Sequence, residues 1–190
     1  MLRYYLWGLG ISLLLVMGVN ILAGAGIVYS ILAVVLGTIF IFLLDALIAW
    51  VIHKMPAEWF CFKKKVFQVA KSERKFYEKI GIKNWKDKVP EMGQLCDFKK
   101  DKIQSFEPAY LNKFLTETCY AEVVHIGMLC IGLLIFLAFP FDKMLGFALP
   151  LFLINAILQI PPIFIQRYNR PKLEMVLIRA ERGKKMQVSD

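Results

Sequence analysis

The stretch IVYSILAVVLGTIFIFLLDALIAWVI, residues 27–52, decides the fold. It contains one charged side chain, Asp45, in an otherwise uncharged and mostly apolar run. A helix of about 20 apolar residues is long enough to cross the hydrocarbon core of a bilayer, and it satisfies its own backbone hydrogen bonds there. The stretch therefore predicts a transmembrane helix.

Three further apolar runs lie on either side of this helix, at about residues 4–22, 121–139 and 144–165. Short joints connect the runs in pairs. We expect an all-α membrane protein with four transmembrane helices in two hairpins, an amphipathic helical insert and a cytoplasmic tail. The insert would cover residues 53–118 and the tail residues 166–190, and the whole chain would form a single membrane domain.

The composition excludes several classes of protein. Hydrophobic residues make up 58% of the 190 residues, whereas soluble domains usually have about 45–50%. This excludes an ordinary soluble enzyme, a disordered chain, a collagen and a secreted disulfide scaffold. The net charge of +9 does not indicate nucleic-acid binding, because the aromatic residues lie in apolar runs rather than in a basic groove.

The positive residues predict the orientation. The insert holds 15 of the 24 Lys and Arg residues, and most of the others follow the fourth run. Positive segments stay in the cytoplasm, so both termini and the insert should be cytoplasmic. As an alternative, Arg3, the first apolar run and the small residues 23–25 could form a cleaved signal peptide, which would leave the orientation of the rest unchanged.

The cysteines indicate a reducing compartment. The four residues form no C-x-x-C pair, so we expect free thiols. They are Cys61, Cys96, Cys119 and Cys130.

The first part of the insert has helical periodicity. Apolar residues recur at three- and four-residue steps from Trp59 to Ile80, with lysines and arginines between them. This pattern predicts one amphipathic helix lying in the headgroup layer and binding anionic lipid headgroups. A solvated helix packed on the bundle is the alternative. Gly81 should end the helix, and Pro90 and Gly93 should mark a turn.

Ionisable residues at the membrane face are the candidates for function. An ionisable side chain in a span costs about 2.5–3.5 kcal/mol, so it is usually paired or functional. Asp45 lies in the second run, and His53 follows eight residues later on nearly the same helix face. We expect Asp45 to pair with His53 or with an arginine of the tail.

A second group lies at the start of the third run. His125 follows Glu122 by three residues, and Glu117 precedes it by eight. A histidine oriented by a carboxylate can serve as a general base. Two alternatives remain: the Glu-x-x-His spacing could hold a metal ion, or these side chains could pair with Lys and Arg to seat the bundle.

The fourth run ends in a polar motif. Asn155, Gln159 and Gln166 fall on one stripe, and the prolines at 161 and 162 interrupt the hydrogen-bond ladder. Arg167 and Arg170 follow and could bind a phosphate or stabilise an oxyanion. With the predicted topology, all these groups reach the cytoplasmic membrane interface, where a lipid head group could meet a cytosolic molecule.

Three motifs resemble a known family. Residues 117–125, ETCYAEVVH, resemble the ET-x-x-AE-x-x-H stretch of the bacterial glycosyl-4,4'-diaponeurosporenoate acyltransferases. Residues 165–173, IQRYNRPKL, resemble that family's QRYNRPRL segment, with Lys172 where arginine is more usual. Residues 85–88, WKDK, resemble its W-K-x-K element. The resemblance extends in order and spacing over residues 59–173.

The resemblance implies transfer of a fatty acyl chain to a sugar hydroxyl of a membrane glycolipid, a glycosylated carotenoid in the named member of the family. It implies a bacterial plasma membrane. The acyl donor would be a co-substrate (acyl-CoA, acyl carrier protein or a phospholipid), with no bound cofactor or metal. The His-x-x-x-x-Asp signature of other acyltransferases is absent. Another lipid-modifying enzyme, such as a methyltransferase or a metal-dependent hydrolase, and a non-catalytic lipid-binding subunit are the alternatives.

We infer the roles from residue chemistry. His125 is the expected general base, Glu122 orients it, and Glu117 is a second carboxylate. The remaining candidates would bind substrate. Arg167, Asn169 and Arg170 would bind the donor phosphate or stabilise the oxyanion, and Trp85, Lys86 and Asp87 would line the mouth of the site. The set is completed by Gln166, Tyr168, Asp45 and His53. The acceptor, the acyl length and the oligomeric state are left open by the sequence.

Overall fold

A computed structural model describes residues 2–89 and 103–189. Every regular element in those ranges is helical. The chain divides into two compact units, and each is described by itself. We call Met1–Lys54 with Val124–Pro161 the apolar unit, and Met55–Val123 with Pro162–Asp190 the basic unit.

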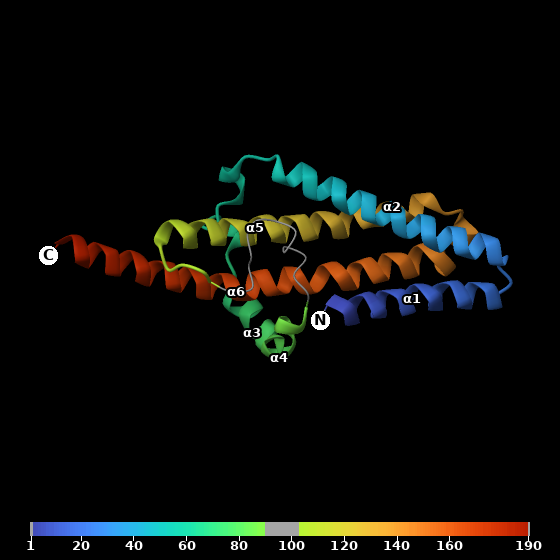
Figure 1. The fold of residues 1–190 in the computed structure, drawn as a ribbon, viewed down its shortest axis with the longest axis horizontal. Helices are drawn as coiled ribbons and strands as arrows, with labels where there is room; N and C mark the ends of the chain where they lie inside the picture. The colour runs from blue at the N-terminus through green and yellow to red at the C-terminus, as the bar shows by residue number, and fades with distance from the viewer. Residues whose placement is uncertain (1, 90–102, 190) are drawn as a thin grey trace. The chain divides into compact units, whose positions relative to one another are not determined.

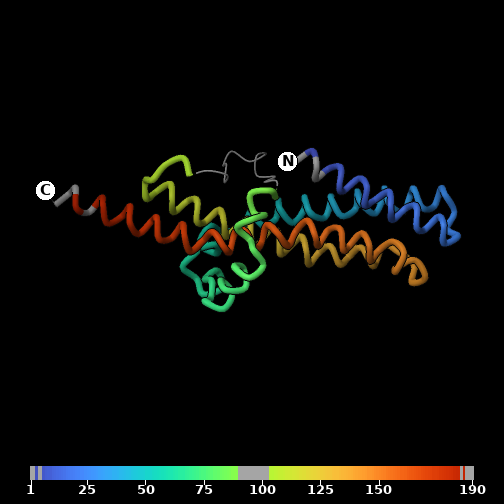
Figure 2. Tube along the Cα trace, turned by 90° about the horizontal axis from the view of Figure 1, so that it is seen from below, coloured from blue at the N-terminus to red at the C-terminus, as the bar shows by residue number. Residues whose placement is uncertain are grey.

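The apolar unit begins with a helical hairpin. Helix α1 (Leu2–Leu22) and helix α2 (Ile27–His53) are joined by a short turn and contact each other (Figures 1 and 2). Gly24, with φ +90°, lies in the turn between them, a conformation that glycine adopts without strain. The prediction of a helix over residues 27–52 is confirmed by α2.

The second half of this unit is less regular. Helix α5 (Pro108–Ile131) continues as a 3-10 segment, η5 (Gly132–Ala138). A 3-10 turn, η6 (Phe141–Lys143), and a π-helical segment, η7 (Met144–Ala148), lead into helix α6 (Leu149–Ser189).

The core of the apolar unit draws on α2 and on the segments η5, η7 and α6. Ile41 of α2 packs with Ile135, Ala148 and Leu151 in one buried cluster. Gly37 allows this approach, because a Cβ there would lie 2.7 Å from Leu151. Burial of apolar side chains therefore joins α2 to the return segment that follows α5.

Three helical stretches are long and apolar enough to cross a membrane: Ile27–His53, Pro108–Ala138 and Phe141–Lys184. Large apolar side chains on α2 face outward, and Leu36, Leu43 and Trp50 are each more than half exposed. Lipid is the solvent in which such a surface is stable. The chain is a membrane protein. The fourth predicted span stays a prediction, because the apolar part of α1, Leu6–Leu22, is shorter than the others.

Helix α6 continues through Pro161 and Pro162 to Ser189. The sequence predicts that these prolines interrupt the hydrogen-bond ladder. In the structure the helix continues past them, and the tail is helical. Each proline removes one backbone donor, yet the turns on either side keep the helix continuous.

The predicted single amphipathic helix over residues 59–80 is wrong. The segment forms two 3-10 turns, η1 (Ala57–Phe60) and η2 (Lys65–Phe67), and only then helix α3 (Lys71–Lys79). Extended backbone at Cys61 and Gln68, with ψ of 116° and 142°, separates them.

The burial pattern gives the physical reason for these breaks. Phe60 and Phe62 are both buried, although a helix would place residues two apart on opposite sides, whereas Trp59 and Val66, two residues of the predicted apolar face, are exposed. Burying phenylalanines that do not share one helical face favours a folded-back chain over a continuous helix.

The rest of the basic unit is compact. Gly81, with φ +62°, follows α3, which confirms the predicted helix end. Helix α4 (Ile82–Trp85) and the turn η3 (Lys86–Lys88) come next. The buried cluster of this unit brings insert and tail together and consists of Tyr77, Ile82, Ile165 and Tyr168. The predicted turn at Pro90 and Gly93, and Cys96, lie outside the described residues.

Candidate functional site

Two clusters of buried polar side chains stand out, one in each unit. The imidazole cluster of the apolar unit consists of Asp45, His125, Asn155 and Gln159. The arginine cluster of the basic unit consists of Glu73, Thr118, Glu122, Arg167 and Arg170.

The imidazole cluster is a chain of hydrogen bonds. His125 Nδ1 lies 2.7 Å from Gln159 Oε1. Gln159 Nε2 donates to Asp45 Oδ2 at 3.1 Å and to Asn155 Oδ1 at 3.1 Å. Asn155 Nδ2 donates to the Met128 carbonyl oxygen at 3.3 Å. Helices α2, α5 and α6 thus each contribute to one network.

The backbone around this cluster allows close approach. Asn155 and Gln159 are four residues apart on α6, so their side chains meet on one face. Gly132 lies against Asn155, and a Cβ there would be 2.3 Å from Asn155 Nδ2. Gly127 has the same role against α2, because a Cβ there would be 2.8 Å from Ile48. Glycine at these two positions makes room for the polar side chains and for helix α2.

A small cavity borders the cluster. It has a volume of about 30 Å³ and is lined by apolar side chains together with Thr38, Asp45 and Asn155. Within the described residues, Asp45 Oδ1 and Thr38 Oγ1 are buried without a hydrogen-bond partner. The volume has room for about one or two water molecules.

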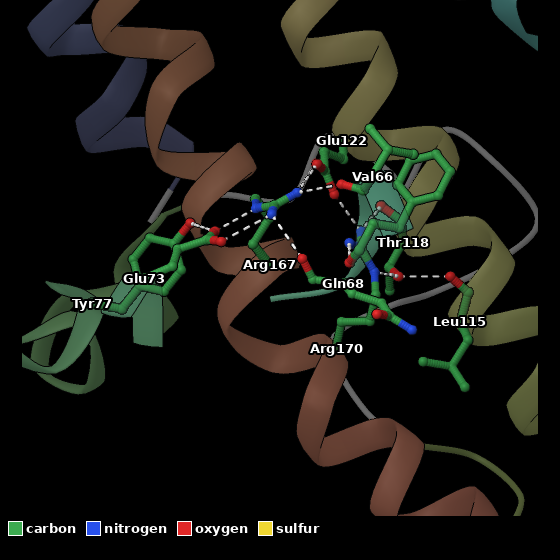
Figure 3. Close-up of polar contacts among 10 residues, drawn as sticks. Val66, Gln68, Glu73, Tyr77, Leu115, Thr118, Glu122, Arg167 and Arg170 are labelled. Carbon is green, nitrogen blue, oxygen red and sulfur yellow. Dashed lines mark hydrogen bonds and ion pairs between the residues drawn. The ribbon is translucent and has the colours of Figure 1, made fainter. Parts of the chain in front are cut away.

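The arginine cluster is built from ion pairs (Figure 3). Arg167 binds Glu73 through Nε and through Nη2, the latter at 2.9 Å from Oε2. Its Nη1 donates to Glu122 Oε1 at 2.5 Å. Two backbone carbonyl oxygens, those of Val66 and Gln68, accept at 3.2 Å. Arg167 therefore ties α6 to α5 and to the insert.

Arg170 is fully buried. Its Nη2 lies 2.6 Å from Glu122 Oε2, and its Nε donates to Thr118 Oγ1 at 3.1 Å. The carbonyl oxygens of Phe67 and Thr118 accept from Nη1 and Nη2 at 2.8 and 3.1 Å. Two arginines and two glutamates balance each other here, which is the condition under which buried charges are tolerated.

Glu73 connects the cluster to helix α3. The hydrogen bond from Arg167 holds the pKa of the Glu73 carboxyl below its ordinary value, although burial acts in the opposite direction. Burial and the hydrogen bond to Glu73 raise the pKa of Tyr77. Its hydroxyl therefore stays protonated and donates a hydrogen bond to Glu73 Oε1 at 2.5 Å.

The predicted catalytic residues fall in both units. The contacts described for Glu122 are with the two arginines, and the contact described for His125 is with Gln159. The orientation of His125 by Glu122 therefore stays a prediction. Glu117 is half-buried on α5. The contact that the structure gives Asp45 is with Gln159. His53 is exposed, and its Nδ1 lies 2.7 Å from the Ala49 carbonyl oxygen.

The predicted substrate-binding residues of the basic unit lie in varied surroundings. Trp85 packs against the buried cluster, and its Nε1 donates to the Ile80 carbonyl oxygen at 3.2 Å. Lys86 pairs with Asp87 at 2.5 Å. Tyr168 is buried, with Lys172 Nζ 3.7 Å from its ring centroid. The other two residues, Gln166 and Asn169, are half-buried on α6.

Sequence reasoning left four members of the clusters out of the predicted site: Asn155, Gln159, Thr118 and Glu73. Gln159 was visible as part of a polar stripe, and its four-residue spacing from Asn155 was the signal for a site. Thr118 lies inside the resembling motif but is not ionisable. Glu73 gave no signal, because its partner Arg167 is 94 residues away in the sequence.

In the described ranges, no group of three or more His, Cys, Asp or Glu side chains could hold a metal ion. The three cysteines described, Cys61, Cys119 and Cys130, are free thiols.

Comparison with known proteins gives one finding. A family model described as glycosyl-4,4'-diaponeurosporenoate acyltransferase matches residues 56–179. The matched range contains the whole arginine cluster and His125, Asn155 and Gln159 of the imidazole cluster. Neither a search of curated proteins nor a search of solved structures gave a match.

Proposed function

Because the chain belongs to the glycosyl-4,4'-diaponeurosporenoate acyltransferase family, we propose that it transfers a fatty acyl chain to a hydroxyl of a membrane glycolipid. The family match over residues 56–179 is the observation that carries this proposal. The apolar helices support a lipid acceptor, because they hold the enzyme where such a substrate resides. A glycosylated carotenoid is the acceptor that the family description names.

His125 is the proposed general base. Its imidazole accepts the proton of the acceptor hydroxyl while the hydroxyl oxygen attacks the acyl carbonyl carbon. The bond from that carbon to the donor's sulfur or oxygen then breaks, and the leaving group takes the proton from the imidazole. The products are the acyl ester and the free thiol or alcohol of the donor, and no oxidant or metal is needed for this balance.

We place the reaction at the cytoplasmic face of a bacterial plasma membrane. The excess of lysine and arginine in the insert and tail favours this orientation. Helix α1 would be the fourth span, which puts both termini in the cytoplasm. Exposed lysines at 63–65 and exposed Trp59 suit contact with anionic headgroups.

The two arginines of the cluster are better suited to a scaffold than to a donor site. Arg170 is fully buried and already has a carboxylate, a hydroxyl and two carbonyl oxygens as acceptors. A bound phosphate would have to displace Glu122. We therefore propose that Arg167 and Arg170 hold helix α6 against α5 and the insert rather than bind the donor.

Untargeted lipid mass spectrometry tests the proposal. The cells compared are those with the intact gene, a deletion, and the deletion complemented with the wild type, His125→Ala or Arg182→Ala. Arg182 is an exposed residue on α6 and is the matched control. We expect one glycolipid to lose a fatty acyl mass in the deletion, with rescue by the wild type and Arg182→Ala but not by His125→Ala. An unchanged lipidome in the deletion would overturn the activity, and full rescue by His125→Ala would overturn the role of the histidine.

A further inference from the structure

We infer that Gln159 and Asp45 are positioning residues that hold His125 in the tautomer with its proton on Nδ1, which leaves Nε2 as the basic nitrogen. This inference rests on the proposed function for its catalytic meaning, but not for its geometry. The argument starts from a backbone carbonyl and proceeds along the hydrogen bonds of the imidazole cluster.

The Met128 carbonyl oxygen can only accept a hydrogen bond. Asn155 must therefore present its Nδ2 to it, at 3.3 Å, and this turns Asn155 Oδ1 toward Gln159. An amide oxygen in turn accepts, so the group of Gln159 that faces it has to be Nε2, at 3.1 Å. The orientation of the Gln159 amide is thus fixed from one side of the network.

Asp45 fixes the same orientation from the other side. Its Oδ2 lies 3.1 Å from Gln159 Nε2 and accepts from it. A rotated Gln159 amide would place its oxygen against both Asp45 Oδ2 and Asn155 Oδ1, and these lone pairs would repel each other. Both acceptors are buried, where an unmatched polar contact costs the most.

With the amide fixed, Gln159 Oε1 faces His125. The distance of 2.7 Å to Nδ1 requires a donor on the imidazole, so Nδ1 carries the proton. In a neutral imidazole the lone pair then resides on Nε2. When Nε2 takes up the proton of a hydroxyl, Nδ1 keeps its hydrogen bond and the ring does not need to turn.

Asp45 has a second effect through the same amide. Its carboxyl group polarises Gln159 Nε2–H, and hydrogen bonds in a chain strengthen one another. This favours the imidazolium that forms when the base accepts its proton, as an acidic residue behind a catalytic histidine does when it contacts the ring directly. Asp45 would thus act on the reaction through Gln159 rather than by binding substrate.

Nitrogen-15 NMR of the full chain in lipid nanodiscs tests the inference. The chain has two histidines, so labelled histidine gives two ring systems, and His53→Gln assigns them. We expect His125 in the Nδ1–H form in the wild type. In Gln159→Leu both tautomers should be populated. In Asp45→Asn the Nδ1–H form should persist, because the new side-chain oxygen still accepts from Gln159. Thr38→Val, which changes another residue lining the cavity, is the control and should keep the Nδ1–H form.

Acyl-transfer rates of the same variants give the second readout. Gln159→Leu should lose a large part of the roughly 10²–10⁴-fold contribution of a general base, and Asp45→Asn a smaller part. An Nε2–H form in the wild type, or an unchanged tautomer in Gln159→Leu, would overturn the inference. A third outcome separates the two claims. If the wild type has the Nδ1–H form and Gln159→Leu loses it, but the wild type transfers no acyl group, the proposed function is overturned. The inference on the tautomer is then still supported.

Discussion

The imidazole cluster and the arginine cluster are both built on helices α5 and α6, yet they differ in the chemistry that they can perform. The arginine cluster pairs two positive with two negative side chains and adds a hydroxyl and backbone carbonyl oxygens. The imidazole cluster contains one carboxyl group, two amides and one imidazole.

The comparison teaches how a buried polar network can serve stability or chemistry. Buried charges that are matched and hydrogen-bonded hold a structure together, because removing one partner leaves the other charge buried and unpaired. A histidine held by an amide through one ring nitrogen can accept a proton on the other. We therefore expect variants of the first kind to unfold the basic unit and variants of the second kind to stop the reaction.

The largest expected effect on stability is that of Arg170→Met. The change leaves Glu122 without one of its two cations, and breaking a buried ion pair usually costs about 3–5 kcal/mol. Unfolding in detergent, followed by circular dichroism, measures it. Arg182→Met, an exposed arginine on the same helix, should have little effect. A wild-type unfolding curve for Arg170→Met would contradict the scaffolding role.

Gly132→Ala should have an intermediate effect, on the imidazole cluster. The new Cβ would lie 2.3 Å from Asn155 Nδ2, so the Asn155 amide must move. Overpacking of this kind costs about 1–3 kcal/mol, and the displaced amide should also lower the acyl-transfer rate.

Gly183→Ala is the matched control for that change. No atom lies within 4 Å of a Cβ at Gly183, and the substitution should be neutral or stabilise α6 by up to about 1 kcal/mol. Equal rates and stabilities for both alanine variants would show that Asn155 tolerates displacement.

The sequence was sufficient for the parts of the fold that depend on local pattern. The apolar run over residues 27–52 is long and contains a single charged residue, and the bounds of α2 match it to within one residue. Gly81 ends α3 because glycine accepts a positive φ, which is a local property. Such features need no knowledge of distant partners.

The insert shows why local pattern failed elsewhere. Its apolar residues have helical spacing, but burial of both Phe60 and Phe62, which a helix would place on opposite sides, decided the backbone. The candidate site has the same limit, since the partners of Glu73 and Asp45 are 94 and 114 residues away. Spacing from Glu122 identified His125 as a candidate, and position at the predicted membrane face identified Arg167, but their partners could be seen only in the folded chain.

The smallest expected effect is a pH dependence of the arginine cluster. The folded-state pKa of Glu73 lies below its usual value of 4.5, so its ion pair stabilises the fold above that pH. This stabilisation is lost as the pH falls through the folded-state pKa, because the native carboxyl must then take up a proton.

Glu73→Gln isolates that contribution. Unfolding measured between pH 6 and pH 3 should show a shallower loss of stability in this variant than in the wild type. Glu181→Gln, at an exposed position on α6, is the control and should follow the wild type. Parallel curves for Glu73→Gln and wild type would show that the ion pair with Arg167 contributes no acid sensitivity.

One pair of assays tests most directly whether the arginine cluster stabilises the fold and the imidazole cluster carries the reaction. The purified chain, His125→Ala and Arg170→Met would each be assayed for acyl transfer to a glycolipid and for thermal unfolding in the same lipid. We predict that His125→Ala loses about 10²–10⁴-fold in rate with an unchanged unfolding temperature, and that Arg170→Met unfolds at a clearly lower temperature. An active His125→Ala, or an Arg170→Met that is inactive but as stable as the wild type, would contradict the account.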